Sequence, residues 1–359
     1  MSEIWVTHGL WKRFLFSCFF ILVLLSIKEP LIARDNDESP PPFVPPVYGY
    51  KRITDFSGPH SDTDPCVSPD GNMIAFLRNV PTERGCFICV VSADGSDVRE
   101  IASIQTGQVL GLCWLPDGAH LALGLSRDTK DGHLTDIQQI SITGDGEPFP
   151  YQNRKVAPQG KHPAISRDGK LAYVYRNNIV VELNGEEQIY LTMSGFQSHP
   201  NWSHNGTWLI YHSSPGLALQ DSFQEDATVL RMKMIKDGEG HGWCSMPRFC
   251  PDSEKILCIG LIDQKYDLWV FPQVDGVPYR VTDDEFMEAG ADWLPDGRIV
   301  FSSNKAGEFA LWMAVEGLVE EAATQGDDMS IQEGEDPDTG RPLQESILSE
   351  KDPVDHEDR

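Results

Sequence analysis

Three side chains of metal-ligating type occupy matching places in the chain. Asp64, His162 and His199 each directly precede a proline, and each lies seven residues before a glycine. Two imidazoles and one carboxylate form a donor set that suits a divalent transition metal. Histidines at repeated positions more often hydrogen-bond to the neighbouring backbone. We therefore predict no metal, no cofactor and no catalytic residue, and keep these three as the metal candidates.

A cysteine pair has the spacing of redox and zinc sites, Cys86-x-x-Cys89. The surrounding residues predict a strand, in which side chains three positions apart point to opposite faces. No second pair completes a four-thiolate site. We therefore interpret the pair as structural, and Cys89 and Cys258 as small apolar fillers of buried strands.

A repeat positions the candidate residues. Six segments have a turn sequence of the type Trp-Ser-Pro-Asp-Gly, in which proline presets φ, aspartate bonds its own backbone and glycine accepts a positive φ. They are residues 67–71, 114–118, 165–169, 202–206, 249–253 and 293–297. Their last residues are 47, 51, 37, 47 and 44 positions apart. This period is typical of the four-stranded blade of a β-propeller.

The segments between the turns predict the other strands of each blade. Near-continuous apolar runs follow the turns, at 73–77, 121–123, 171–175, 208–211, 256–259 and 299–301. Such runs indicate strands buried on both faces. Third strands are predicted at 87–92, 137–142, 179–183, 229–235, 268–271 and 310–315, and short fourth strands at 99–101, 189–192 and 280–282. Most third strands end at Asp-Gly or Asn-Gly, which are hairpin signals.

The sixth copy lacks a fourth strand of its own. Residues 51–55 resemble residues 279–283, which contain the fourth strand of the fifth copy. We therefore predict an all-β fold, a six-bladed β-propeller closed by an N-terminal strand that completes the last blade. Closure removes the exposed edges of an open stack of sheets.

The two faces of the predicted ring differ in their connections. All Pro-Asp-Gly and Asp-Gly turns project from one face, and connections of variable length share the other. The variable connections include residues 126–133, 152–162 and 213–227. Because variable loops commonly carry recognition, we expect binding on that second face.

The turn followed by an apolar strand, an Asp-Gly hairpin and a short last strand resembles the propeller repeat of the TolB family. The resemblance covers roughly residues 50–317 and implies a periplasmic, protein-binding propeller, since TolB binds a peptidoglycan-associated lipoprotein through its propeller. The α/β domain that precedes the TolB propeller is replaced here by a proline-rich stretch. The resemblance therefore implies an exported protein-protein interaction scaffold with an envelope or extracellular protein as its partner.

The same repeat occurs in propellers of prolyl-oligopeptidase-type peptidases and of polysaccharide lyases. A peptidase of this type would need a hydrolase domain and a Gly-x-Ser-x-Gly turn. The sequence has no such turn, so we interpret the chain as a non-peptidase. The alternative that stays open is a metal-dependent carbohydrate-active enzyme, lyase-like, with its metal near His162 and His199. We expect the scaffold rather than the enzyme.

The segments around the propeller predict where the protein resides. Lys12 and Arg13 precede an apolar run at 14–27, so residues 1–33 are interpreted as a signal peptide or an uncleaved signal anchor. Residues 34–50 form a proline-rich spacer, residues 51–317 the propeller, and residues 318–359 an acidic tail expected to be disordered. We predict a periplasmic or extracellular location, with membrane contact only through residues 14–27 if they are not cleaved.

The charge of the chain excludes one class of partner. The 29 basic and 55 acidic residues give a net charge of −26. A chain this acidic repels phosphate backbones, so we expect no nucleic acid partner.

Overall fold

The computed structural model describes residues 43–318, except 56–57, 82, 84, 145–146, 154–157, 184–186, 192–195, 215, 222–242, 263 and 274–276. The predicted signal segment, most of the predicted spacer and nearly all of the acidic tail lie outside the described residues. The chain divides into two units, Met1–Val44 and Pro45–Arg359, and every described strand belongs to the second. Within the described part, no helix has the length and apolar character needed to span a bilayer.

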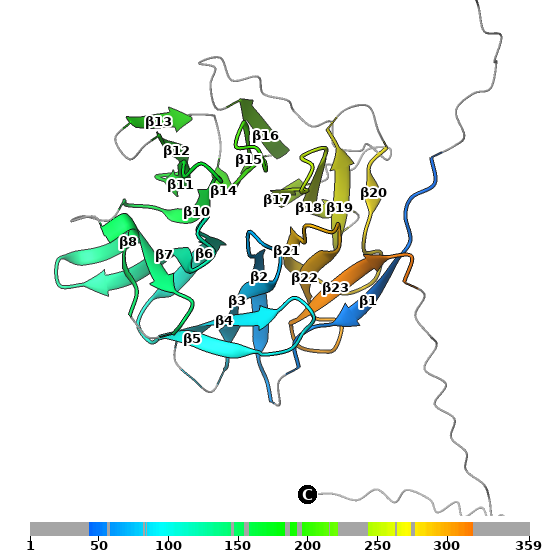
Figure 1. The fold of residues 1–359 in the computed structure, drawn as a ribbon, viewed down its shortest axis with the longest axis horizontal. Helices are drawn as coiled ribbons and strands as arrows, with labels where there is room; N and C mark the ends of the chain where they lie inside the picture. The colour runs from blue at the N-terminus through cyan, green and yellow to red at the C-terminus, as the bar shows by residue number, and fades with distance from the viewer. Residues whose placement is uncertain are drawn as a thin grey trace, which may run out of the picture. The chain divides into compact units, whose positions relative to one another are not determined.

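In the second unit, the described strands form six antiparallel sheets arranged as blades around a centre (Figure 1). The first strand of each blade lies innermost, and these strands contact one another in sequence until β21 meets β2. The innermost strands are β2 (Ser61–Val67), β6 (Gln108–Trp114), β10 (Lys161–Ile165), β14 (Gln197–Trp202), β17 (Trp243–Phe249) and β21 (Glu288–Trp293). The predicted all-β, six-bladed propeller is therefore confirmed.

The remaining strands follow outward in chain order, except in the sixth blade, where β1 is outermost. The second strands are β3 (Met73–Asn79), β7 (His120–Thr129), β11 (Leu171–Tyr175), β15 (Trp208–Ser213), β18 (Lys255–Ile262) and β22 (Ile299–Ser303). The third strands are β4 (Cys86–Ser92), β8 (Gly132–Ser141), β12 (Asn178–Leu183), β16 (Gly216–Asp221), β19 (Lys265–Pro272) and β23 (Ala310–Glu316). The described fourth strands are β5 (Arg99–Ile104), β9 (Phe149–Pro150), β13 (Glu187–Leu191), β20 (Tyr279–Arg280) and β1 (Tyr48–Arg52), and a short 3₁₀ helix, η1 (Tyr151–Asn153), follows β9.

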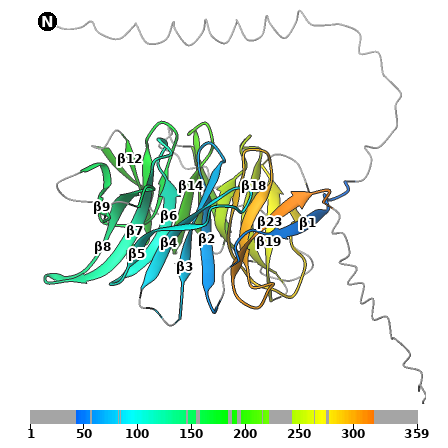
Figure 2. The same cartoon turned by 60° about the horizontal axis from the view of Figure 1, so that its bottom comes forward.

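The N-terminal strand closes the ring. β1 pairs antiparallel with β23, with Arg52 opposite Trp312, and the two strands run side by side in Figures 1 and 2. Just beyond β1, the Ile53 N–H donates to the Leu311 carbonyl (2.7 Å), and the Leu311 N–H donates to Thr54 Oγ1 (2.9 Å). The predicted closure is confirmed, with the strand beginning three residues before the predicted start.

The structure corrects the third strand of the fourth blade. We predicted this strand at 229–235, and those residues lie outside the described part of the chain. The strand that pairs with β15 is β16, which lies within the predicted loop 213–227. Ser213 pairs with Gly216, so a tight turn connects the two strands. Leu217 and Leu219 alternate along β16 and are both buried, and this apolar face stabilises the pairing.

A second predicted loop, 126–133, is largely strand. Residues 127–129 continue β7 and pair with residues 132–134 of β8. Arg127 donates two hydrogen bonds to the Asp136 carboxylate (2.6 and 3.1 Å), which ties the extended hairpin together. The variable connection in this blade is therefore a long hairpin.

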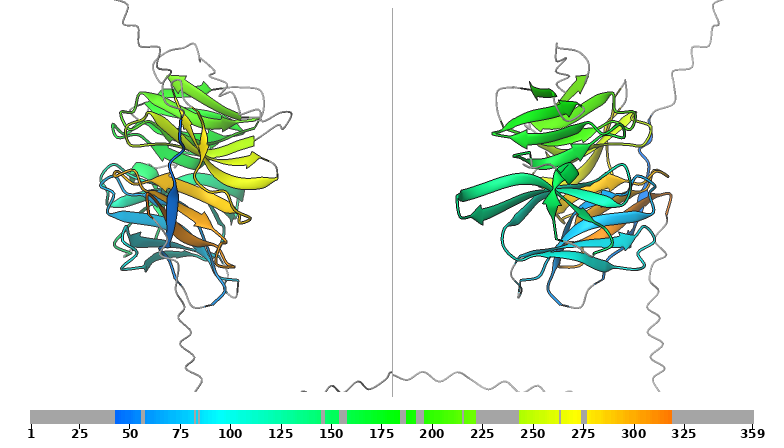
Figure 3. Two further views of the ribbon diagram at one scale, coloured as in Figure 1. Left: turned by 90° about the vertical axis from the view of Figure 1, so that its right-hand side faces the viewer. Right: turned by 60° about the vertical axis from the view of Figure 1, so that its left-hand side comes forward.

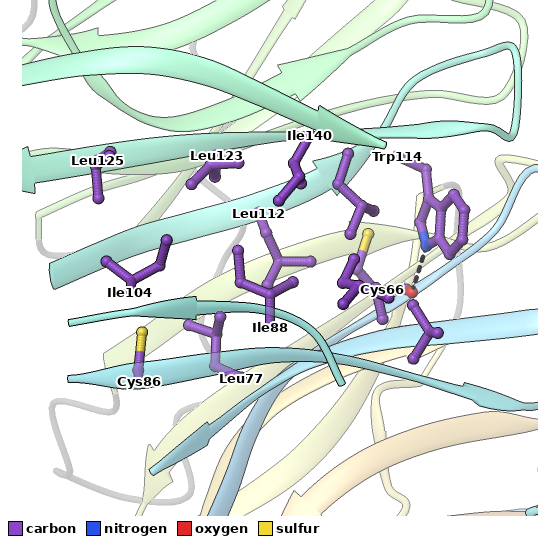
Figure 4. Close-up of a cluster of buried hydrophobic side chains, with 14 residues drawn as sticks. Cys66, Leu77, Cys86, Ile88, Ile104, Leu112, Trp114, Leu123, Leu125 and Ile140 are labelled. Atoms are coloured by element: carbon purple, nitrogen blue, oxygen red, sulfur yellow. Dashed lines mark hydrogen bonds between the residues drawn. The ribbon is translucent and has the colours of Figure 1, made fainter. Parts of the chain in front are cut away.

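Neighbouring blades pack against one another through apolar side chains. The side views in Figure 3 show how the sheets are arranged. Between the first two blades, Leu77 and Ile88 lie against Leu112 and Leu123 (Figure 4). The Trp114 indole N–H crosses this interface and donates to the Cys66 carbonyl (2.8 Å). The apolar runs therefore form strands buried on both faces, as predicted.

The cysteine pair follows the same geometry. Cys86 belongs to the core between the first and second blades, whereas Cys89 belongs to the core between the first and sixth blades. The two side chains thus lie on opposite faces of β4. All cysteines among the described residues are free, and Cys89 and Cys258 are buried at 2% and 1% exposure.

Candidate functional site

Every innermost strand contains one extra residue relative to its partner strand, which forms a β-bulge. At each bulge one residue has a positive φ, between 49° and 127°. These six residues are Asp64, Gly111, His162, His199, Met246 and Gly290. The three candidate residues predicted from sequence therefore occupy equivalent bulges around the centre of the ring, and we call the six residues the bulge ring.

Neighbouring bulges approach closely. A Cβ added to Gly111 would lie 3.0 Å from His162 Nδ1, and one added to Gly290 would lie 3.4 Å from Asp64 Cα. Positive φ and short distance together explain glycine at these two places.

The two histidines of the bulge ring face each other. The ring centroids of His162 and His199 are 4.1 Å apart, with the planes tilted by 47°. His199 Nδ1 is hydrogen-bonded to Ser198 Oγ (2.9 Å), while His162 Nδ1 is buried and has no partner among the described residues. Burial, with the positive charges of Lys161 and Arg248, lowers the pKa of His162 to about 4, and burial beside His162 and Arg248 lowers the pKa of His199 well below its ordinary value. Both imidazoles are therefore neutral at physiological pH.

Asp64 lies in the first blade, whereas the histidines belong to the third and fourth. Burial raises the pKa of Asp64 to about 6, although the charge of Arg248 acts in the opposite direction. Among the described residues, no three His, Cys, Asp or Glu side chains are grouped as metal ligands. The structure therefore brings His162 and His199 together and does not group Asp64 with them.

A cavity of about 220 Å³ opens beside the bulge ring, toward the face that carries the Pro-Asp-Gly turns. We call this the turn face, and the space the turn-face cavity. Its lining comes from all six blades and includes Cys66, Cys113, Arg167, Asn201, His204, Arg248, Phe249, Asp292, Trp293 and Pro295. Among the described residues, the cavity thus lies on the face opposite to the variable connections, where we had expected binding.

Arg248 is the charged group that points into this region from the fifth blade. Its side chain is 19% exposed, and Nε lies 4.0 Å from Asp292 Oδ1. Nη1 donates to the Pro247 carbonyl (3.2 Å). Burial is the main cause of the pKa shifts of Asp64, Asp292 and both histidines, and the charge of Arg248 contributes to each of them.

Sequence reasoning missed both Arg248 and the cavity. Arg248 lies two residues after Met246, a bulge residue that directly precedes a proline, as Asp64, His162 and His199 do. Aligning the six repeats on that residue would have placed Arg248 and Asp292 at one level of the ring.

Comparisons with known proteins place this geometry in context. No protein-family model matches the chain. The uncharacterised protein Atu1656 of Agrobacterium fabrum is 34% identical over 200 residues, which cover 55% of this chain and 52% of that protein. The uncharacterised peptidase YuxL of Bacillus subtilis is 25% identical over 172 residues, which cover 48% of this chain and 23% of that protein. The chain thus spans about half of the first relative and about a quarter of the second.

The crystal structure of TolB from Acinetobacter baumannii matches 68% of this chain and 64% of its own, with a TM-score of 0.52 and 18% identity. The chain has a TolB-like propeller fold. A manganese complex of an oligogalacturonate lyase is more distant, with a TM-score of 0.46 and 13% identity over 76% of this chain and 97% of that chain. Because the match to that lyase is distant, it does not bear on the activity of this chain.

Proposed function

We propose that this TolB-like propeller is a protein-protein interaction scaffold on the periplasmic or extracellular side of the cell envelope. The observation that carries the proposal is the turn-face cavity, where all six blades of a TolB-like ring contribute to one concave surface. The apolar run at 14–27, read as an export or anchoring signal, supports the location.

The charge of the turn-face cavity contrasts with that of the chain. Arg167 and Arg248 line it against one carboxylate, Asp292, whereas the whole chain has a net charge of −26. A positive concave site on an acidic protein attracts negative groups locally while the rest of the surface repels them. We therefore expect a partner to dock with an acidic element toward this cavity.

A photo-cross-linking residue at the cavity rim tests the proposal. His204 is exposed at the rim, and Glu308 is exposed on the opposite face, between β22 and β23. We expect a cross-linker at position 204 to capture one envelope protein, identified by mass spectrometry, at several times the yield obtained from position 308. Equal yields from both positions, or no captured protein from position 204, would contradict the proposal.

The second candidate function is a metal-dependent carbohydrate-active enzyme of the lyase type. The observation that favours it is the neutral histidine pair, because neutral imidazole is the form that binds metals. Two imidazoles without a neighbouring third ligand bind a metal only weakly.

Metal removal separates the two candidates. For the scaffold we expect purified protein to contain less than a tenth of an equivalent of transition metal, and EDTA to leave the midpoint of thermal unfolding unchanged within about one degree. A stoichiometric metal, lost together with stability in a His162→Ala variant, would favour the enzyme.

A further inference from the structure

We propose that Arg248 binds a carboxylate of the partner's polypeptide chain, either a C-terminal carboxylate or an Asp or Glu side chain, within the turn-face cavity. This rests on the proposed scaffold function and names the chemistry by which the partner is recognised.

The first step is a comparison of Arg248 with two other arginines that are shielded from solvent, Arg78 and Arg127. Arg78 donates two hydrogen bonds to Asp62, both of 2.7 Å, and Arg127 donates two to Asp136. Arg248 is similarly shielded from solvent, yet it donates one hydrogen bond, to the Pro247 carbonyl, and none to a carboxylate among the described residues. Its guanidinium therefore retains donors for a two-oxygen acceptor.

The second step concerns Asp292, the carboxylate nearest to Arg248. Its Oδ2 accepts from the Val67 N–H (2.8 Å) in the next blade, and its Oδ1 accepts from the Trp293 N–H (2.9 Å). These two bonds fix the carboxylate to backbone and hold it 4.0 Å from Arg248 Nε. Asp292 thus orients the arginine by its charge and accepts no hydrogen bond from the guanidinium, whose paired N–H donors can bind another acceptor.

The third step is the surroundings of the fork. Phe249, Trp293 and several prolines line the same cavity, so a carboxylate there is shielded from water and its bond to arginine is strengthened. The neutral His162 and His199 add no competing positive charge, and Arg167 at the rim adds a second cation.

The fourth step is size. The cavity of about 220 Å³ is smaller than the roughly 300–1,000 Å³ of pockets that enclose drug-sized ligands. It fits one acidic side chain or one chain end, with the remainder of a partner outside. The occupant of this shape and charge is a protruding part of a polypeptide.

Peptide binding to the full chain tests the inference. The probes are an acetylated tripeptide of Ala, Leu and Glu with a free C-terminus and its uncharged counterpart, which ends in Gln amide, each titrated by calorimetry. We expect the acidic tripeptide to bind at least tenfold more tightly than the amide, and Arg248→Met to abolish that preference. Arg248→Lys, which keeps the charge without the planar fork, should retain only part of it.

The matched control is Arg298→Met. Arg298 lies in the turn that follows β21 and pairs with Asp296 (2.8 Å). This variant should keep the full preference for the acidic tripeptide. If Arg248→Met and Arg298→Met lose the preference equally, the preference depends only on the overall charge of the protein, and the inference is overturned. If Arg248→Met unfolds, the comparison of Arg248→Lys with wild type decides, and an unchanged preference there also overturns it.

A further arm distinguishes the source of the carboxylate. Galacturonate carries the same group on a sugar, and Arg248-dependent binding of galacturonate tighter than that of the tripeptide would overturn the assignment to polypeptide. The cross-link from position 204 separates the two proposals. A partner captured equally by wild type and Arg248→Met leaves the scaffold intact and refutes the role of Arg248. Peptide binding that depends on Arg248, with no partner captured, supports the carboxylate site and refutes the scaffold.

Discussion

We expect Asp62→Asn to destabilise the propeller by about 3–5 kcal/mol, because it removes one partner of a buried ion pair. Asp62 on β2 is fully buried and accepts both hydrogen bonds of the Arg78 guanidinium from β3. His60 Nε2 lies 3.9 Å from the same carboxylate. With asparagine, the buried guanidinium of Arg78 loses the negative charge that accepts both of these hydrogen bonds. Urea denaturation of wild type and variant measures the loss.

Two controls distinguish the buried charge from a general loss of polar contact. Asp55→Asn breaks an ion pair with Arg52 whose carboxylate is 87% exposed, and should cost less than about 1 kcal/mol. The double variant Asp62→Asn with Arg78→Met removes the uncompensated cation, and we expect it to be more stable than Asp62→Asn alone. A double variant that is less stable than the single one would contradict the explanation.

The architecture was predictable because the residues that form and stabilise the first turn of each blade are close together in the sequence. Ser68 Oγ hydrogen-bonds to Asp70 (2.6 Å) and accepts the Met73 N–H (2.9 Å), and the fifth blade builds the same turn with Cys250 in place of serine. A pattern of residues that bond within one turn is visible in sequence without knowledge of the rest of the chain. The closing strand was found for the same reason, since residues 51–55 resemble residues 279–283.

Errors arose where the pattern did not determine pairing. The third strand of the fourth blade was assigned to the apolar segment before Asp237-Gly238, because Asp-Gly marks hairpins elsewhere in the chain. The pairing strand β16 lacks such a signal, and its place depends on a tight turn between Ser213 and Gly216 and on burial against the next blade. These are tertiary effects that overrule local propensity.

The candidate site was only partly predictable for a related reason. The residue before proline marked Asp64, His162 and His199 as equivalent, and the structure places them on equivalent bulges. The separation of Asp64 from the two histidines, and the position of Arg248 at 4.0 Å from Asp292, depend on how six strands converge. A single sequence reports the type and spacing of residues, but the distance between blades is set by packing.

The pH dependence of stability should follow an acidic residue between the fifth and sixth blades. Glu288 on β21 is 5% exposed, and burial, with the negative charges of Asp284 and Asp267, raises its pKa from 4.5 to about 8. Ser303 Oγ donates to Oε1 (3.3 Å), Lys305 opposes the rise through its charge, and Oε2 has no partner among the described residues. The neutral acid is therefore the form that the fold accommodates.

This pKa determines the sign of the effect. Between pH 4.5 and pH 8 the unfolded chain has released the Glu288 proton and the folded protein retains it, so stability falls as pH rises through that window. At about 1.4 kcal/mol for each pH unit, the total over this window is on the order of 5 kcal/mol. The contribution is fully present below pH 4.5 and is lost above pH 8.

Glu288→Gln should therefore remove most of this dependence, because glutamine has the shape of the neutral acid and does not titrate. We expect the free energy of unfolding of the wild type to fall between pH 5 and pH 8.5 by on the order of 4 kcal/mol more than that of the variant, measured by urea denaturation at both pH values. Glu254→Gln, at an exposed position after the fifth-blade turn, is the control and should follow the wild type. Parallel losses in wild type and Glu288→Gln would show that the buried carboxyl ionises without cost. The stability of the junction between the last two blades would then have to be explained by other groups, with Asp267, whose pKa burial raises to about 6, as the next to replace.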